Sequence, residues 1–175
     1  MAAAVAAILL FAGASFFFAL AETALFSLAK WQVAQLAEKN PRAGKVVAVL
    51  LEHPQHLLAT LALGNTFANA AMLAVVLRMV FDAHWMLALT MIALLALTLL
   101  GCEVFPKTLA VRQPERWALR VGWPLLVFQK ATAPLHLAAR WLNVVILTKT
   151  ARQMDATPAL TDAEYHELLE MAFQQ

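Results

Sequence analysis

Glu103 is the residue best placed for charge chemistry, because it follows the run Leu99–Cys102 and precedes Pro106 and Lys107. An ionisable side chain at the end of a membrane-length apolar segment is costly to remove from water. A proline three residues later leaves backbone carbonyl groups without their usual helical donors. These oxygens together favour a cation. Two interpretations stay open: Glu103 binds a cation, or it marks the membrane surface and points to water.

Two asparagines, Asn65 and Asn69, form a second polar feature in a segment that is otherwise apolar. Their spacing of four places both amides on one face of a helix. Two amide oxygens and a carboxylate from another segment are hard ligands of the kind that Mg²⁺ prefers. The alternative is that the asparagines join helices through interhelical hydrogen bonds, each contributing about 1 kcal/mol.

Three apolar runs supply the elements that must position these groups. They are Ala2–Leu20, Leu57–Phe81 and Trp85–Leu100, each near the roughly 20 residues that a helix needs to cross a membrane. Of the 175 residues, 62% are hydrophobic and 14% are charged, a composition unlike that of a soluble domain. We therefore expect an all-α membrane protein with three transmembrane helices.

The segment between the first two runs predicts a helical hairpin. Trp31–Lys39 and Arg42–Glu52 are rich in helix-forming residues and are separated by the turn signal Asn40-Pro41. Pro54 suits the first turn of the second span. The hairpin is basic and the connection after Phe81 has no Lys or Arg, so the positive-inside rule puts the N-terminus outside and the hairpin in the cytoplasm.

After Lys107 the chain is expected to form juxtamembrane belt helices at the cytoplasmic interface. Pro114, Pro124 and Pro134 divide it into apolar pieces too short to span a membrane. Three arginines recur every four residues and should form one stripe that faces lipid phosphates. They are Arg112, Arg116 and Arg120.

We expect a membrane domain over residues 1–150 and an acidic cytoplasmic helix over residues 151–175, which carries the capping-box pattern Thr161-Asp162-Ala163-Glu164. A further cytoplasmic portion is expected to follow. Cys102 is the only cysteine, so an intrachain disulfide and a zinc–thiolate cluster are excluded. The five histidines are scattered and no catalytic motif is present, so an enzyme is not expected.

Three motifs in this order resemble the transmembrane domain of the cyclin M, CorB and CorC family of magnesium transporters: Glu22–Leu28, Gly64–Asn69 and Glu103–Ala110. The resemblance covers essentially the whole chain. It implies Na⁺-coupled Mg²⁺ export by a homodimer, with a cytosolic CBS-domain pair after the membrane domain. By position it assigns Asn65, Asn69 and Glu103 as Mg²⁺ ligands, and we expect these three to converge in one pocket.

Two positions depart from the family pattern. Ala21 stands where a serine ligand is usual, and Cys102 stands where glycine is usual. Glu22 is expected to bind a coupling cation or to pair with Lys30 or Lys107. Export of an organic cation such as a polyamine, or a membrane anchor without transport activity, are the alternatives. Restoring the hydroxyl by Ala21→Ser is expected to raise Mg²⁺ affinity.

The second span also carries a small-residue pair, Gly64 and Ala68, which permits close approach of a neighbouring helix. Met72 follows on the same face and can fill irregular gaps. We expect these residues to contribute to a homodimer built on the second and third spans.

Overall fold

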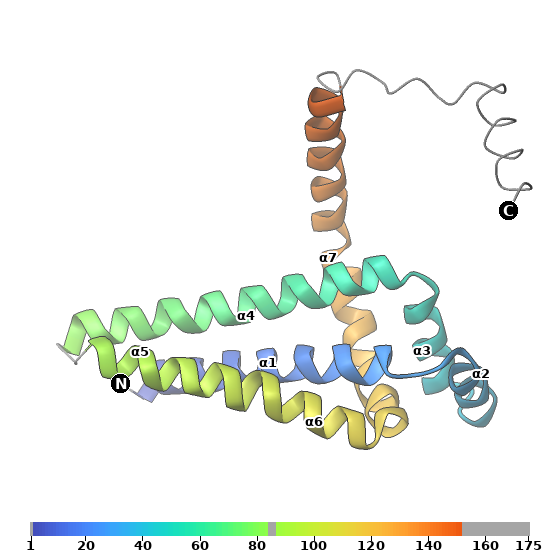
Figure 1. The fold of residues 1–175 in the computed structure, drawn as a ribbon, viewed down its shortest axis with the longest axis horizontal. Coiled ribbons are helices and arrows are strands. Elements are labelled where there is room, and N and C mark those ends of the chain that lie inside the picture. The colour runs from blue at the N-terminus through green and yellow to red at the C-terminus, as the bar shows by residue number, and fades with distance from the viewer. Residues whose placement is uncertain (1, 84–86, 152–175) are drawn as a thin grey trace, which may run out of the picture. The chain divides into compact units, whose positions relative to one another are not determined.

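The structure is a computed structural model that describes residues 2–83 and 87–151. These residues form helices and no strand, which confirms the all-α prediction. The elements in chain order are α1 (Ala2–Phe26), α2 (Lys30–Lys39), α3 (Ala43–Glu52), α4 (Pro54–Ala83), α5 (Leu87–Ala96), the π-helix η1 (Leu97–Val104), α6 (Phe105–Arg112) and α7 (Pro114–Ala151) (Figure 1).

Three stretches of the described chain are long and apolar enough to cross a membrane: Ala2–Phe26, Pro54–Phe81 and Ala88–Arg112. This confirms the prediction of three spans. The third is longer than expected, because α5, η1 and α6 follow one another without interruption. Glu103 therefore lies within the third span rather than at its end.

The π-helix explains why Pro106 does not end the third span. In η1 the hydrogen bonds join residues five apart, and the Phe105 N–H donates to the Leu100 carbonyl. Pro106 then falls in the first turn of α6, where a missing N–H costs little. The helix continues past the proline with a changed register.

The helix α1 lies between α4 and the third span, and the chain up to Thr132 forms one compact unit around it. The helix α4 runs antiparallel to α1, while η1 and α6 run in the same direction as α1 (Figure 1). The hairpin α2–α3 follows the C-terminal end of α1, which confirms the predicted helical hairpin. Pro54 begins α4, also as predicted.

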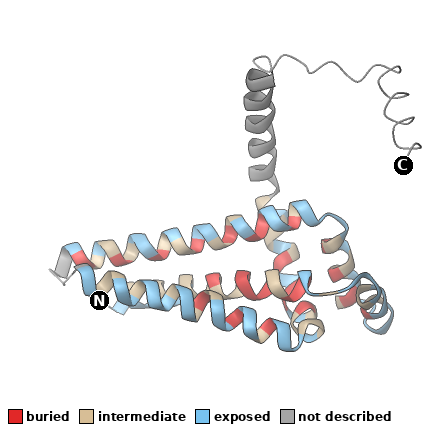
Figure 2. Cartoon of the chain, viewed as in Figure 1, coloured by how far each residue is buried: buried red, intermediate tan, exposed pale blue. Residues whose placement is uncertain are grey.

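An apolar core holds the hairpin end of this unit together. Leu25 of α1, Leu50 of α3, Leu57 of α4 and Leu125 of α7 are each 0 to 1% exposed and belong to one cluster. Figure 2 shows that the buried residues gather toward this end. The first part of α7 is therefore packed into the fold.

Two expectations for the segment after Lys107 are wrong. The helix α7 continues through Pro124 and Pro134 instead of breaking there. Leu125, directly after the first of these prolines, is fully buried in the core, and such packing outweighs the low helix propensity of proline. The arginines form no single stripe, because Arg112 ends α6 and Arg116 belongs to α7.

Candidate functional site

A buried hydrogen bond joins the first two spans at the level of Asn65. The hydroxyl of Ser15 on α1 donates to Oδ1 of Asn65 on α4, with an oxygen–oxygen distance of 2.7 Å. Ser15 is 0% exposed and Asn65 is half-buried. The second lone pair of Oδ1 stays available for another partner. The side chain of Asn65 is thus oriented by α1.

The third span meets the same part of α1 through Cys102. Its Sγ lies 3.6 Å from the Ala12 carbonyl oxygen and adjoins Ser15. Cys102 is 2% exposed, which is consistent with a thiol that fills a helix–helix contact. Ser15 therefore touches side chains from both other spans, and Glu103 follows directly after one of them.

Asn69 lies one helical turn from Asn65 and carries the least satisfied polar atom near this contact. Its Oδ1 is buried and accepts no hydrogen bond from the described residues. Leaving a buried acceptor without a donor costs about 1 to 3 kcal/mol. A bound cation would offset this free-energy cost, because the amide oxygen would then serve as its ligand.

Glu103 is half-buried, and it forms no hydrogen bond or ion pair with the described residues. The described residues also contain no cluster of three or more His, Cys, Asp or Glu side chains. The structure thus brings together Ser15, Asn65 and Cys102. The convergence of Glu103 with both asparagines stays a prediction.

The other predicted charge partners lie further from this contact. Glu22 is half-buried and seven residues after Ser15, so it shares a face of α1 about two turns along the helix. Lys107 is exposed on α6 and Lys30 is exposed at the start of α2. Within the described ranges, Glu22 pairs with neither lysine.

The structure supplies the first-span hydroxyl from Ser15 and not from position 21. Ala21 is 0% exposed and belongs to the apolar core cluster. It lies six residues after Ser15 and so about 120° around the helix from it. A serine introduced there would place its hydroxyl in apolar surroundings, which changes the expectation for Ala21→Ser from tighter Mg²⁺ binding to lower stability.

Sequence reasoning missed Ser15. A single hydroxyl in an apolar run gives no periodic signal, and Ser15 lies fifty positions from its partner. The one available signal was the cost of a polar group at mid-span, which interhelical hydrogen bonds usually offset.

The small residues of α4 face α1 within the chain. A Cβ atom added to Gly64 would collide with the ring of Phe18. Ala68 is 2% exposed and Met72 is 0% exposed. The expectation that these residues form the dimer contact is therefore wrong, because their surface is already covered in the single chain.

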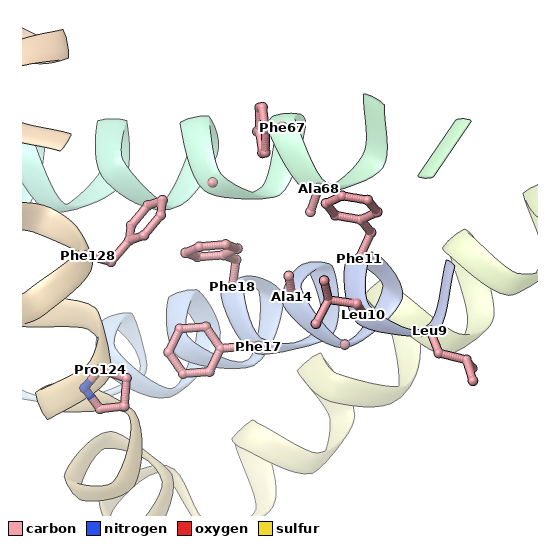
Figure 3. A pocket seen from close by; sticks show the side chains of 12 residues that line it. Leu9, Leu10, Phe11, Ala14, Phe17, Phe18, Phe67, Ala68, Pro124 and Phe128 are labelled. Carbon is pink, nitrogen blue, oxygen red and sulfur yellow. The ribbon is translucent and has the colours of Figure 1, made fainter. Parts of the chain in front are cut away.

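An apolar cavity of 710 Å³ opens between α1, α4 and the first part of α7 (Figure 3). Phe17, Phe18, Phe67 and Phe128 are among its lining residues. The rings of Phe18 and Phe128 approach to 4.8 Å between centroids. No charged side chain lines this cavity, so it does not suit a cation. The candidate cation site is the polar contact around Ser15 and Asn65.

Residues 5–175 match the sequence profile of the cyclin M transmembrane N-terminal domain. The chain belongs to this family. The cyclin M match confirms the family resemblance and agrees with the three candidate membrane spans of the described chain. A membrane domain of this family is consistent with a transporter role.

Three relatives of this cyclin M domain come from a plant and two bacteria. It is 30% identical over 160 residues to a chloroplastic DUF21 domain-containing protein of Arabidopsis thaliana. This alignment covers 90% of the chain and 24% of the relative. It is 28% identical over 142 residues to the UPF0053 inner membrane protein YfjD of Escherichia coli, covering 80% and 32% respectively. It is 32% identical over 142 residues to a UPF0053 protein of Haemophilus influenzae, covering 80% and 33%. The chain therefore spans 24 to 33% of the length of these relatives.

Ser15→Ala is expected to weaken cation binding by this cyclin M domain by about fivefold, the equivalent of one neutral hydrogen bond of about 1 kcal/mol. The change removes the donor that orients Asn65. Mg²⁺ titration of the purified variant measures the effect. The control is Ser27→Ala, because Ser27 is exposed after the end of α1. Equal affinities in the two variants would contradict a role for Ser15 in the site.

Proposed function

We propose that the chain is the membrane domain of a divalent-cation transporter that exports Mg²⁺ in exchange for Na⁺. The observation that carries the proposal is the buried, unbonded Oδ1 of Asn69, one turn from the Ser15–Asn65 contact. Hydroxyl, amide and carboxylate oxygens are hard ligands, and Mg²⁺ selects such ligands. Membership of the cyclin M family supports the same ion.

Each residue of the proposed site has a distinct role. Glu103 supplies the negative charge, and Asn65 and Asn69 supply neutral oxygens. Ser15 holds the amide of Asn65 in place. Mg²⁺ gives up its waters reluctantly, so the remaining positions of its octahedral shell are filled by retained water. Glu22, on the same face of α1, is proposed to bind the coupling Na⁺.

The third span is irregular beside the proposed site, because the π-helix η1 lies there. A change from i→i+4 to i→i+5 hydrogen bonds shifts the register between α5 and α6. Non-helical or strained backbone at membrane depth is tolerated where protein or a water-filled path surrounds it. We place the path of the ion beside this part of the third span, at the polar side chains of Ser15, Asn65 and Asn69.

Transport by the full-length protein in liposomes tests the proposal. Liposomes are loaded with a Mg²⁺-sensitive dye, Mg²⁺ is added outside, and an outward Na⁺ gradient is imposed. Na⁺ leaving the liposomes is expected to drive Mg²⁺ into them, so Mg²⁺ entry should depend on the Na⁺ gradient. If the same liposomes move spermidine and not Mg²⁺, the chain is an organic-cation exporter. If neither ion moves, the chain is an anchor or regulator.

The orientation and partners follow as part of the same proposal. The basic hairpin α2–α3 faces the cytoplasm, the N-terminus lies outside, and a cytosolic CBS-domain pair follows the membrane domain in the longer protein. The bacterial relative YfjD is named as an inner membrane protein. We place this chain in the same kind of membrane.

A homodimer is proposed to form on the third span. In its most apolar stretch, 6% of residues are buried, against 22% and 33% in the first and second spans. Leu89, Ile92 and Leu95 are 58 to 67% exposed along this helix. Such a face is open to lipid or to a second copy of the chain.

Cysteine cross-linking tests this face directly. Cys102 is the only cysteine and is 2% exposed, so Ile92→Cys introduces the one accessible thiol. Oxidation in membranes is expected to link most chains as dimers. Leu9→Cys is the control, because Leu9 is 67% exposed on α1. Cross-linking at Leu9 that equals or exceeds that at Ile92 would contradict a dimer on the third span.

A further inference from the structure

A second polar site lies at the hairpin end of the fold, where α2 meets the junction of α6 and α7. A cavity of 350 Å³ is formed there by two arginines, two glutamines, a glutamate and a proline, namely Arg112, Arg116, Gln32, Gln113, Glu115 and Pro114. Its volume is within the range of about 300 to 1,000 Å³ that is typical of small-ligand sites. The charged groups at its wall are two guanidinium groups and one carboxylate.

Hydrogen bonds join four of the side chains that line this cavity: Gln32, Gln113, Glu115 and Arg116. The Ala29 N–H donates to Oε1 of Gln32 over 2.9 Å, and Nε2 of the same glutamine donates to Oε1 of Glu115 over 3.4 Å. A third hydrogen bond runs from Nη1 of Arg116 to Oε1 of Gln113 over 3.0 Å. A guanidinium has five N–H donors, so Arg116 keeps four for a ligand.

The cavity lies beside the end of the third candidate membrane span. Arg112 is the last residue of the third membrane span. Trp31, which precedes Gln32, is 67% exposed, and Trp123 of α7 is 56% exposed. Tryptophans are enriched at the interface between lipid and water, and Trp31 follows the end of the first candidate span by five residues. A molecule that enters this cavity is therefore most readily a membrane lipid.

We infer that the cavity binds the headgroup of a zwitterionic phospholipid, one that carries a phosphodiester and a primary ammonium, as phosphoethanolamine does. Arg112 and Arg116 bind the phosphate oxygens, since planar guanidinium groups match phosphate in paired hydrogen bonds. Glu115 accepts a hydrogen bond from the ammonium. When the headgroup lacks the ammonium, nothing in the ligand offsets the repulsion between the Glu115 carboxylate and the phosphate.

The third predicted arginine is not part of this site. The guanidinium of Arg120 lies 5.1 Å from the centre of the Trp117 ring, in a cation–π contact. It is absent from the residues that line the cavity. Arg120 therefore serves as a matched control, an interfacial arginine whose removal changes the net charge by the same amount as removal of Arg112.

Native mass spectrometry of the full-length protein, extracted in mild detergent and supplied with single lipids, tests the inference. Phosphatidylethanolamine is expected to be retained over phosphatidylglycerol and over phosphatidylcholine, whose trimethylammonium cannot donate to Glu115. Arg112→Gln with Arg116→Gln is expected to lower retention of phosphatidylethanolamine by about tenfold or more. Arg120→Gln is expected to leave it unchanged.

Glu115→Gln separates ligand binding from helix stability. Glu115 lies in the first turn of α7, where an acid also stabilises the helix N-terminus. A purely structural role predicts a lower unfolding temperature with unchanged lipid preference. The inference predicts that phosphatidylethanolamine and phosphatidylglycerol become equally retained, because the ammonium has lost its carboxylate.

Three results would overturn the inference. The first is equal retention of the three lipids by the unmodified protein. The second is a preference that survives the double arginine replacement in protein that remains folded by circular dichroism. The third is competition by inorganic phosphate as strong as that by glycerophosphoethanolamine, which would make the cavity a site for a soluble phosphate.

Discussion

Glu103→Gln is expected to abolish Na⁺-dependent Mg²⁺ transport and to weaken Mg²⁺ binding by about 100-fold, equivalent to roughly 3 kcal/mol. Glutamine keeps the size of the side chain and one oxygen, but it removes the formal charge of the proposed site. Glu103 is half-buried within the third span, where the screening of its charge by water is reduced. Mg²⁺ titration and liposome transport measure the two effects.

Two controls make this experiment specific. Glu103→Asp keeps the charge and is expected to retain part of the binding. Glu38→Gln removes an exposed carboxylate from α2 and is expected to change neither measurement. Full transport by Glu103→Gln would remove Glu103 from the site and would favour the interpretation that it only marks the membrane surface.

Gly64→Leu is expected to destabilise the membrane domain by about 2 kcal/mol and to lower its unfolding temperature by about 5 °C. The added side chain must displace the ring of Phe18, which is 7% exposed and packed between α1 and α4. The collision also shifts the neighbouring Asn65 relative to Ser15, so Mg²⁺ affinity is expected to fall with stability.

Gly13→Leu is the matched control for this change. Apart from its chain neighbours and the backbone of its own helix, no atom lies within 4 Å of a Cβ added to Gly13, so the new Cβ meets open space. Leucine also has a higher helix propensity than glycine by about 0.5 to 1 kcal/mol. The unfolding temperature in detergent is therefore expected to rise slightly for Gly13→Leu and to fall for Gly64→Leu. A fall of the same size in both variants would contradict the close contact of α1 with α4.

Helices whose length or ends depend on nearby residues were predictable from the sequence. Apolar length determines the three spans, and Asn40-Pro41 with Pro54 determines where the hairpin helices end and α4 begins. Long α7 was mispredicted, because its continuation through Pro124 depends on packing of Leu125 against distant helices. Proline signals a helix break through its nearest neighbours in the chain, whereas the packing of Leu125 involves residues far away in the sequence.

The candidate site was predicted only in part for the same reason. The spacing of Asn65 and Asn69 identified a polar face of α4, and the structure provides that face with a buried partner, Ser15. The pairing of Ser15 with Asn65, and the π-helical turn beside Cys102, depend on how three helices pack together. No property of α1 alone distinguishes Ser15 from a hydroxyl that bonds to its own helix.

Calorimetric titration of Mg²⁺ into the purified full-length protein tests the central claim most directly. A cation site formed by Asn65, Asn69 and Glu103 predicts saturable binding of one Mg²⁺ for each chain, which Ser15→Ala weakens about fivefold and Glu103→Gln weakens about 100-fold. It also predicts that spermidine does not compete at equal concentration. Absence of saturable Mg²⁺ binding, or its complete displacement by spermidine, would contradict a Mg²⁺ site in this membrane domain.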